Sequence, residues 1–207
     1  MLKNIFTNLV KQYSEHTIAE ILWTEIEKAY TGKKRYYHNL NHLENLYREL
    51  EACRNEVNDW DTVLFSLFYH DIVYKATAKN NEEKSAEAAV KALKRIGYPN
   101  DKIAACHKQI LATKSHIATG DNDTDLFTDA DLSILGYPPD AYDTYTVQVR
   151  KEYVIYPDFL YKPGRYKVLE HFLATKPLFK TSVFSEKYET QALENIRREM
   201  AQLKPIQ

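Results

Sequence analysis

The sequence is poor in several features that mark common classes of protein. It has only five glycines and two cysteines among 207 residues, and its net charge at pH 7 is −1. So few glycines disfavour a turn-rich all-β fold, and neither GxGxxG nor GxxxxGK[ST] occurs, which leaves nucleotide binding by a glycine-rich loop unsupported. The near-zero net charge gives no sign of a basic surface, so we expect no nucleic-acid partner.

The sequence also lacks the signals of a secreted or membrane protein. Cys53 and Cys106 are isolated and have no CxxC neighbour, so neither a disulfide framework nor a cysteine-based zinc site is expected. No apolar run approaches the roughly 18–20 residues of a membrane helix, and residues 1–16 have no secretory core. These absences predict a cytoplasmic protein without a membrane partner.

What is present is the composition of an ordinary globular domain. Hydrophobic residues make up 44% of the chain and charged residues 28%, and the length suffices for one compact domain. Apolar residues recur at helical spacing almost throughout, whereas strict two-residue alternation is nearly absent. We therefore predict a single all-α domain over residues 1–207 with about eight to ten helices, in which those after about residue 155 could pack as a C-terminal appendage.

The apolar stripes and the breakers between them outline these helices. Asn81 is expected to cap the helix that ends at Gly97 and Pro99. Pro or Gly breakers are expected at 137–140, 156–159, 162–164 and 176–177. The predicted helices cover approximately 2–13, 18–30, 40–50, 59–71, 81–97, 101–113, 124–136, 139–153, 165–175 and 186–203.

Two histidines stand four residues apart in the stretch YHNLNH. His38 and His42 share a helix face if the helix already runs through residue 38. Asn39 and Asn41 are both good N-caps, however, so the helix could begin between them. In that case His38 lies at the mouth of the helix rather than on its side.

A third histidine stands directly before an aspartate in FYHD. His70 and Asp71 lie near the end of an apolar helix, where both can reach one point beyond that end. Burying an unpaired carboxylate costs several kcal/mol, so Asp71 needs a partner, and a divalent cation would supply one. Downstream, DADLSILG places Asp129 and Asp131 in another helix. Two imidazoles and two carboxylates make a charge-neutral site for a divalent ion, with positions left for water and substrate.

In this order, YHNLNH, FYHD and DADLS resemble the HD superfamily of metal-dependent phosphohydrolases, whose ordered signature is His, His-Asp, Asp. YHNxxH and ADLS are also similar to motifs of the cyclic-nucleotide phosphodiesterases, but LENLY follows where those have AxDV, so their substrate specificity does not transfer. A fuller resemblance is to a bacterial group of predicted HD phosphohydrolases. It spans residues 35–169 through RYYHNLNHL, FYHDIVY, NEEKSA, ILATKSH, DADLSILG, VRKEY and GRYKVL.

The resemblance implies an HD-type helical domain and a set of site residues. His38 would be the general acid, acting together with Asp71, and ADLS favours Asp131 over Asp129. The ion would be Mg, Mn, Zn, Ni or Fe, present once or twice. The implied ligands are His42, His70, Asp71 and Asp131. Taken singly, each has an ordinary alternative: a helix cap for His38, a dipole-compensating residue for His70, and a solvated side chain for His42 or Asp131.

Further residues could serve the site or only the fold. His116 could bind a second metal, contact a substrate phosphate or merely end a helix, whereas His107 follows the apolar register of a partly buried histidine. Glu82 could orient a metal-bound histidine or stabilise a helix start. Substrate phosphate could be held by His116 and by three arginines, which could equally be solvated or paired: Arg35, Arg150 and Arg165.

These observations predict a metal-dependent phosphohydrolase in which metal-activated water attacks phosphorus in a nucleotide or another small phosphate ester. Two other classes stay open. A di-iron oxygenase on the same scaffold would need His107 or His116 as ligands, and a non-catalytic module would hold a metal or nucleotide without turnover. A small phosphate compound is the expected partner, and a homodimer is possible.

Overall fold

The computed structural model describes residues 1–203 and is all-α, as the periodicity of the apolar residues predicts. Within those residues there are ten α-helices, two short 3-10 helices and no strand. The 3-10 helices are η1 (Arg54–Glu56) and η2 (Ser133–Gly136). The α-helices are α1 (Leu2–Lys11), α2 (His16–Tyr30), α3 (Leu40–Ala52), α4 (Trp60–Tyr69), α5 (Asn81–Arg95), α6 (Asn100–Ala112), α7 (Asn122–Leu132), α8 (Pro139–Glu152), α9 (Asp158–Ala174) and α10 (Ser182–Leu203).

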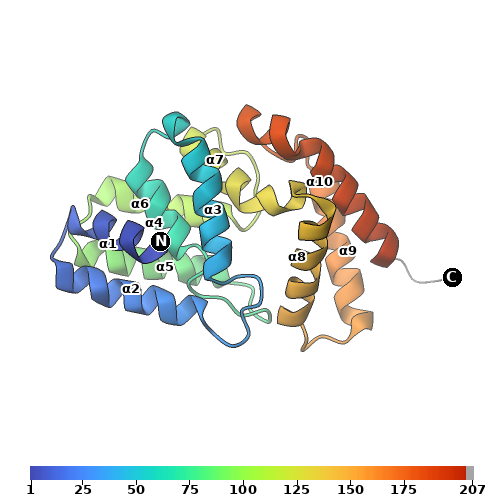
Figure 1. Ribbon diagram of the computed structural model, residues 1–207, viewed down its shortest axis with the longest axis horizontal. Helices are drawn as coiled ribbons and strands as arrows, with labels where there is room; N and C mark the ends of the chain where they lie inside the picture. Colours follow the sequence, from blue (N-terminus) through green and yellow to red (C-terminus); the bar gives the residue numbers. More distant parts are fainter. Residues whose placement is uncertain (204–207) are drawn as a thin grey trace.

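Helix α4 is the centre around which the first seven helices pack (Figure 1). Its residues 62–69 are all buried, which explains why the stretch is apolar on most sides. Helices α1, α3, α5, α6 and α7 all contact it. The end of α4 therefore lies inside the molecule: His70 is buried, and the half-buried residues 71–74 follow it.

The start of α3 is decided by its cap. Asn39 adopts an extended backbone conformation, and its side chain accepts a hydrogen bond from the backbone N–H of Asn41 at 2.8 Å. The helix therefore begins at Leu40, which leaves His38 just ahead of it and His42 in its first turn. Of the two arrangements that the sequence leaves open, the structure adopts the later start.

The starts of α9 and α5 differ from those expected. Helix α9 begins at Asp158 and passes through Pro163, which was expected to break the chain. Proline so close to the start removes only one hydrogen bond, to a turn that is open to solvent, since Phe159 is 74% exposed. Asn81 is the first residue of α5 rather than its cap, and its side-chain amide instead bonds both the N–H and the carbonyl of Lys75.

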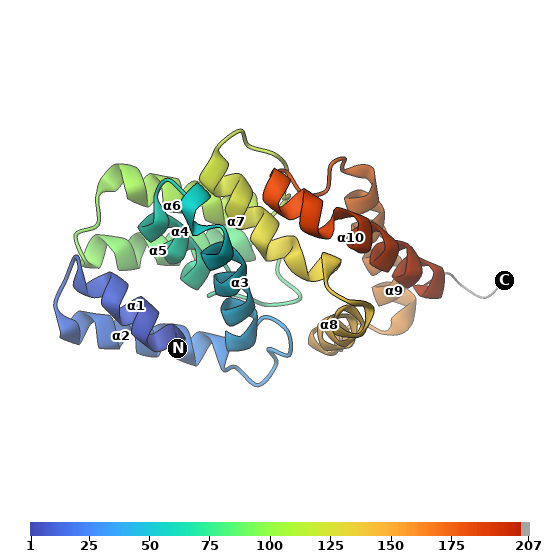
Figure 2. The same ribbon diagram turned by 45° about the horizontal axis from the view of Figure 1, so that its top comes forward.

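Helices α8, α9 and α10 form a second group that packs against α7 and η2 (Figures 1 and 2). Glu49 of α3 accepts hydrogen bonds from Tyr188 and Lys187 of α10 at 2.6 and 2.9 Å. Helix α10 also crosses η2 at Gly136, where an added Cβ would lie 2.5 Å from that of Tyr188. Glycine is thus required by the close approach of the two segments.

Among the helices of residues 1–203, none combines the length and the apolarity that a membrane span requires.

Candidate metal centre and its cavity

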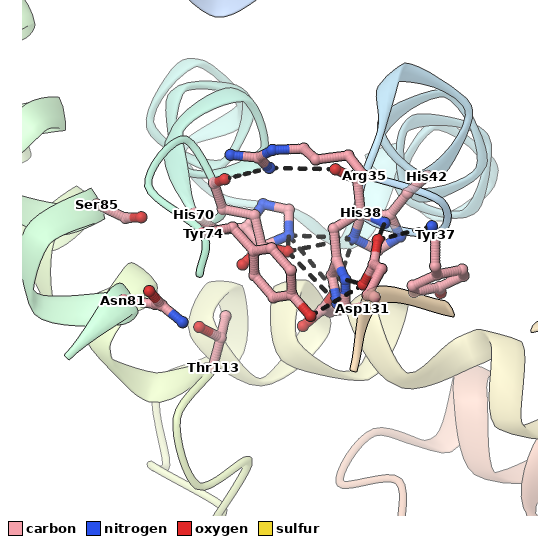
Figure 3. Close-up of polar contacts among 12 residues, drawn as sticks. Arg35, Tyr37, His38, His42, His70, Tyr74, Asn81, Ser85, Thr113 and Asp131 are labelled. Atoms are coloured by element: carbon pink, nitrogen blue, oxygen red, sulfur yellow. Dashed lines mark hydrogen bonds and ion pairs between the residues drawn. The ribbon is translucent and has the colours of Figure 1, made fainter. Parts of the chain in front are cut away.

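Three helices bring their ends together at one point. His42 comes from the first turn of α3, His70 from the C-cap of α4, and Asp131 from the last turn of α7. Both histidines are buried, and one donor atom from each of the three residues lies within 4.8 Å of the other two. Figure 3 shows the two imidazoles turned towards Asp131. This group could hold a metal ion.

The distances between the donor atoms fit a single ion. Two ligands at about 2.1 Å from one metal lie about 3.0 Å apart at a right angle and about 3.4 Å apart at the tetrahedral angle. Nε2 of His42 lies 3.1 Å from Nε2 of His70 and 3.3 Å from Oδ1 of Asp131. Nε2 of His70 lies 3.6 Å from the same carboxylate oxygen.

The other ring nitrogen of His70 is occupied by the backbone. Nδ1 lies 2.9 Å from the carbonyl oxygen of Leu67, to which it donates a proton. In the neutral imidazole this leaves the lone pair on Nε2, the atom that faces the cluster. The hydrogen bond thus selects the tautomer that a metal ligand needs.

Asp71 stands at the edge of this group. Its Oδ2 lies 3.2 Å from Nε2 of His70 and 4.0 Å from Nε2 of His42. Arg35 donates to the backbone carbonyls of Asp71 at 2.6 Å and of His38 at 3.1 Å, so one guanidinium joins the two sequence motifs. The fourth expected ligand therefore faces the same cluster, although its role as a ligand stays a prediction.

The charges of the cluster shift the pKa values of its members. Burial lowers the pKa of His42. Burial also lowers the pKa of His70, but Asp71 and Asp131 outweigh this effect and raise the value to about 9. Burial raises the pKa values of Asp71 and Asp131, yet the surrounding histidines outweigh it and hold both well below their usual range. Both carboxylates are therefore ionised at neutral pH, as metal ligands must be.

His38 is held in place by a carboxylate from the far side of the cavity. Its Nδ1 lies 2.6 Å from Oε2 of Glu152, whose side chain is fully buried. The ring of Tyr74 stacks on that of His38 at 4.3 Å, and the tyrosine hydroxyl donates to Oε2 of Glu152. Nε2 of His38 points towards the cluster and lies 3.9 Å from Oδ2 of Asp71. Burial lowers the pKa of His38, but Asp71 and Glu152 outweigh it and raise the value.

Sequence reasoning missed Glu152 as a site residue. A signal for Glu152 was present in the spacing of α8. Tyr142, Tyr145, Val149 and Glu152 follow one another at intervals of three and four, and all four are buried. A carboxylate that continues a buried face needs a partner inside the protein.

Two residues that the sequence left ambiguous are separated by the geometry. Asp129 points away from the cluster and accepts hydrogen bonds from the backbone N–H groups of Lys180 and Thr181 at 3.0 and 2.8 Å. His116, in contrast, places Nε2 at 3.0 Å from Oδ2 of Asp131. Its backbone is left-handed, with φ of 53°, a conformation that costs a residue with a side chain about 1 kcal/mol. His107 is half-buried on α6 and is not part of the group.

The arginines expected to bind substrate are engaged by the protein. Besides Asp71 and His38, Arg35 also donates to Ile72 at 2.9 Å. Arg150 bonds the carboxylate of Asp158 and two backbone carbonyls. Arg165 makes a two-pronged ion pair with Glu199 inside the second group of helices. A role for these arginines in substrate binding stays a prediction.

A cavity of about 560 Å³ opens beside the cluster. His38, Asp71, His116 and Asp131 line one end of it, and Glu82 lines its wall. The opposite wall comes from α8 and α9, so the cavity lies between the two groups of helices. A small organic phosphate fits in such a volume.

Comparisons of the chain with models of protein families, with curated proteins and with solved structures found no match.

Proposed function

We propose that this protein is a metal-dependent phosphohydrolase of the HD type that cleaves a small phosphate ester. One observation carries the proposal: His42, His70 and Asp131 come from three separate helices and present their donor atoms at distances that suit one ion. The cluster opens into a cavity rather than being sealed by protein. Closed sites are typical of structural metals, whereas catalytic sites keep a position for water or substrate.

A divalent ion bound there would lower the pKa of a water molecule and neutralise phosphate oxygens. The protein supplies the ligands and the proton. Hydrolysis forms a P–O bond from water and breaks the P–O bond to the leaving group, whose oxygen must gain a proton. His38 faces the cluster through Nε2 and is paired at Nδ1 with Glu152. That pairing raises the pKa of His38 and favours its protonated form, whose Nε2–H would protonate the leaving oxygen.

The test is metal-supplemented turnover of a panel of alkyl, aryl and nucleoside phosphates. We expect activity that needs a divalent ion, is abolished by a chelator, and falls by about a hundredfold or more in Asp131→Ala. Asp143→Ala is the matched control, because Asp143 is an exposed carboxylate of α8 whose ion pair with Arg198 lies outside the cavity. Equal rates in the parent and in Asp131→Ala end the proposal.

His116 supports a second candidate. A di-iron oxygenase on this scaffold would need His107 or His116 as a ligand, and Nε2 of His116 lies 3.0 Å from Oδ2 of Asp131. Purified protein that is coloured, contains two equivalents of iron and consumes oxygen would favour that activity. Colourless protein that hydrolyses phosphate esters with other divalent ions would favour hydrolysis.

A further inference from the structure

The cavity beside the metal cluster has few positive charges to offer a substrate. Lys114, Arg165 and Lys167 are the lysines and arginines that line it within residues 1–203. Lys114 is paired with Glu83, and Arg165 is paired with Glu199. Of these three residues, only Lys167 makes no ion pair with the described residues, and its side chain is exposed.

Negative charge, by contrast, lines other parts of the same cavity. Besides Asp71 and Asp131, the cavity is lined by Glu82, which makes no ion pair or side-chain hydrogen bond within the described residues. A divalent ion at the cluster offsets the two aspartates, so the charge left over comes from Glu82 and Lys167 and is close to zero. One phosphoryl group is accommodated by direct ligation to the ion. Each further phosphoryl group adds negative charge to a cavity in which Lys167, the lysine without an ion-pair partner, is already offset by Glu82.

The wall formed by α8 and α9 carries apolar and aromatic side chains beside Arg165, Lys167 and His171. Val149 of α8 and Val168 and Phe172 of α9 line the cavity together with Tyr145 and Tyr153. The ring of Phe172 lies 6.4 Å from the ring of His116, which in turn contacts Asp131. A planar group joined to a phosphate at the cluster thus meets an aromatic side chain within the reach of a small molecule.

We infer that the substrate is a monophosphate ester carrying one planar ring, either a nucleoside monophosphate or an aryl phosphate, and that polyphosphates are rejected. This inference takes the hydrolysis reaction itself from the proposed function. The recognition itself rests on two features: a cavity with no surplus positive charge beyond the ion that binds one phosphoryl group, and the aromatic side chain of Phe172.

The charge argument is tested with one nucleoside as its mono-, di- and triphosphate, using the metal-loaded protein. We expect kcat/KM to be highest for the monophosphate and at least about tenfold lower for the others, because added phosphoryl groups meet Glu82. Glu82→Gln should reduce the difference in kcat/KM between the monophosphate and the di- and triphosphates. Diphosphate or triphosphate turned over as well as the monophosphate would overturn the inference.

The aromatic argument is tested by Phe172→Ala with three monophosphates: a nucleoside monophosphate, phenyl phosphate and ribose 5-phosphate. We expect kcat/KM to fall about tenfold for the two ring-bearing esters and less than about twofold for ribose 5-phosphate. Whichever of the two ring-bearing esters has the higher kcat/KM shows whether the substrate is a nucleoside monophosphate or an aryl phosphate. Phe159→Ala, on the same helix but 74% exposed, is the matched control and should change none of them. An equal loss for all three esters would contradict a ring site at Phe172.

Calorimetry on the metal-loaded protein separates this inference from the proposed function. If no ester is hydrolysed but the monophosphate binds more tightly than the diphosphate, the hydrolase proposal fails and the recognition stands. If hydrolysis occurs with the triphosphate as the best substrate, the hydrolase proposal stands and the inference fails. If no ester binds and none is hydrolysed, both the hydrolase proposal and the inference about the substrate fail.

Discussion

Glu152 is the residue that holds His38 in place. Its Oε1 accepts the backbone N–H groups of Tyr37 and His38, and its Oε2 receives His38 Nδ1 and the hydroxyl of Tyr74. Four contacts leave this buried carboxylate no freedom to turn. It therefore holds the imidazole in position and favours its charged form, in which Nε2 carries an acidic proton.

Glu152→Gln keeps the shape of the side chain and removes the charge. We expect turnover of an alkyl phosphate to fall about a hundredfold, because its leaving oxygen needs a proton. Turnover of 4-nitrophenyl phosphate should fall less than about threefold, because that leaving group departs as an anion. Glu49→Gln, at a buried carboxylate that binds Tyr137 and Tyr188 instead, should reduce both rates equally if at all. An equal loss on both esters in Glu152→Gln would show that Glu152 is only structural.

The raised pKa of His70 makes metal binding depend on pH. With a pKa of about 9, His70 is protonated at neutral pH in the metal-free protein, whereas its carboxylate neighbours are already ionised and the pKa of His42 is lowered. Binding must therefore displace one proton, so the apparent affinity for Mn²⁺ should rise about tenfold per pH unit between about pH 7 and pH 8.5. Titration calorimetry in two buffers of different ionisation enthalpy counts that proton. No proton release at pH 7 would contradict the assignment of His70 as a ligand.

At the scale of single elements, α7 shows how one helix serves both the fold and the site. Asp129 and Asp131 are two residues apart, which places them about 200° apart around the helix. Asp131 therefore faces the cluster, while Asp129 faces the segment before α10 and pairs with Lys180 at 2.7 Å. The amino group of Lys180 also bonds the carbonyl of His116 at 3.3 Å, so the structural side of α7 supports the loop that carries a site residue.

Removing the Asp129 carboxylate should destabilise the protein strongly. Asp129→Ala leaves the buried ammonium of Lys180 and two backbone N–H groups without their acceptor, and such a broken pair costs about 3–5 kcal/mol. The free energy of unfolding from urea titration measures the loss. Asp143→Ala, which breaks an exposed ion pair with Arg198, should change the free energy of unfolding by less than about 1 kcal/mol. A similar small change in Asp129→Ala would mean that the pair with Lys180 does not hold α7.

The helices were largely predictable because apolar spacing and caps act over a few residues. The correct features include the late start of α3 as one of two options and the end of α5 at Arg95, just before the left-handed Gly97. The start of α9 was not predictable, because the cost of Pro163 depends on where the helix begins. Asp129 and Asp131 could be told apart only through the resemblance, since both positions suit a helix equally.

The same contrast holds for the candidate site. His42, His70 and Asp131 could be named from ordered motifs, each only a few residues long. Glu152 could not, because its contact with His38 joins residues 114 positions apart and depends on how α8 packs across the cavity. Sequence patterns predict what a short segment does, whereas the partner of a single carboxylate is decided by tertiary packing.

At the scale of the whole molecule, the cluster exists only in the folded chain. His42, His70 and Asp131 belong to α3, α4 and α7, and the closest two of them in sequence are 28 residues apart. An unfolded chain does not hold three such groups within a few ångström of one another. A metal held by this group would bind the native state far more tightly than the unfolded state, and its binding would raise the stability of the protein.

Thermal unfolding measures this coupling directly. A divalent ion at about a hundred times its Kd adds about 2.7 kcal/mol, and for a chain of this length each kcal/mol raises Tm by about 2–4 °C. We therefore expect an increase in Tm of about 5–10 °C, reversed by a chelator. Asp131→Ala should lose the increase, while Asp143→Ala should keep it, because only the first removes a carboxylate that faces both histidines. An equal increase in both variants would place the metal elsewhere on the protein.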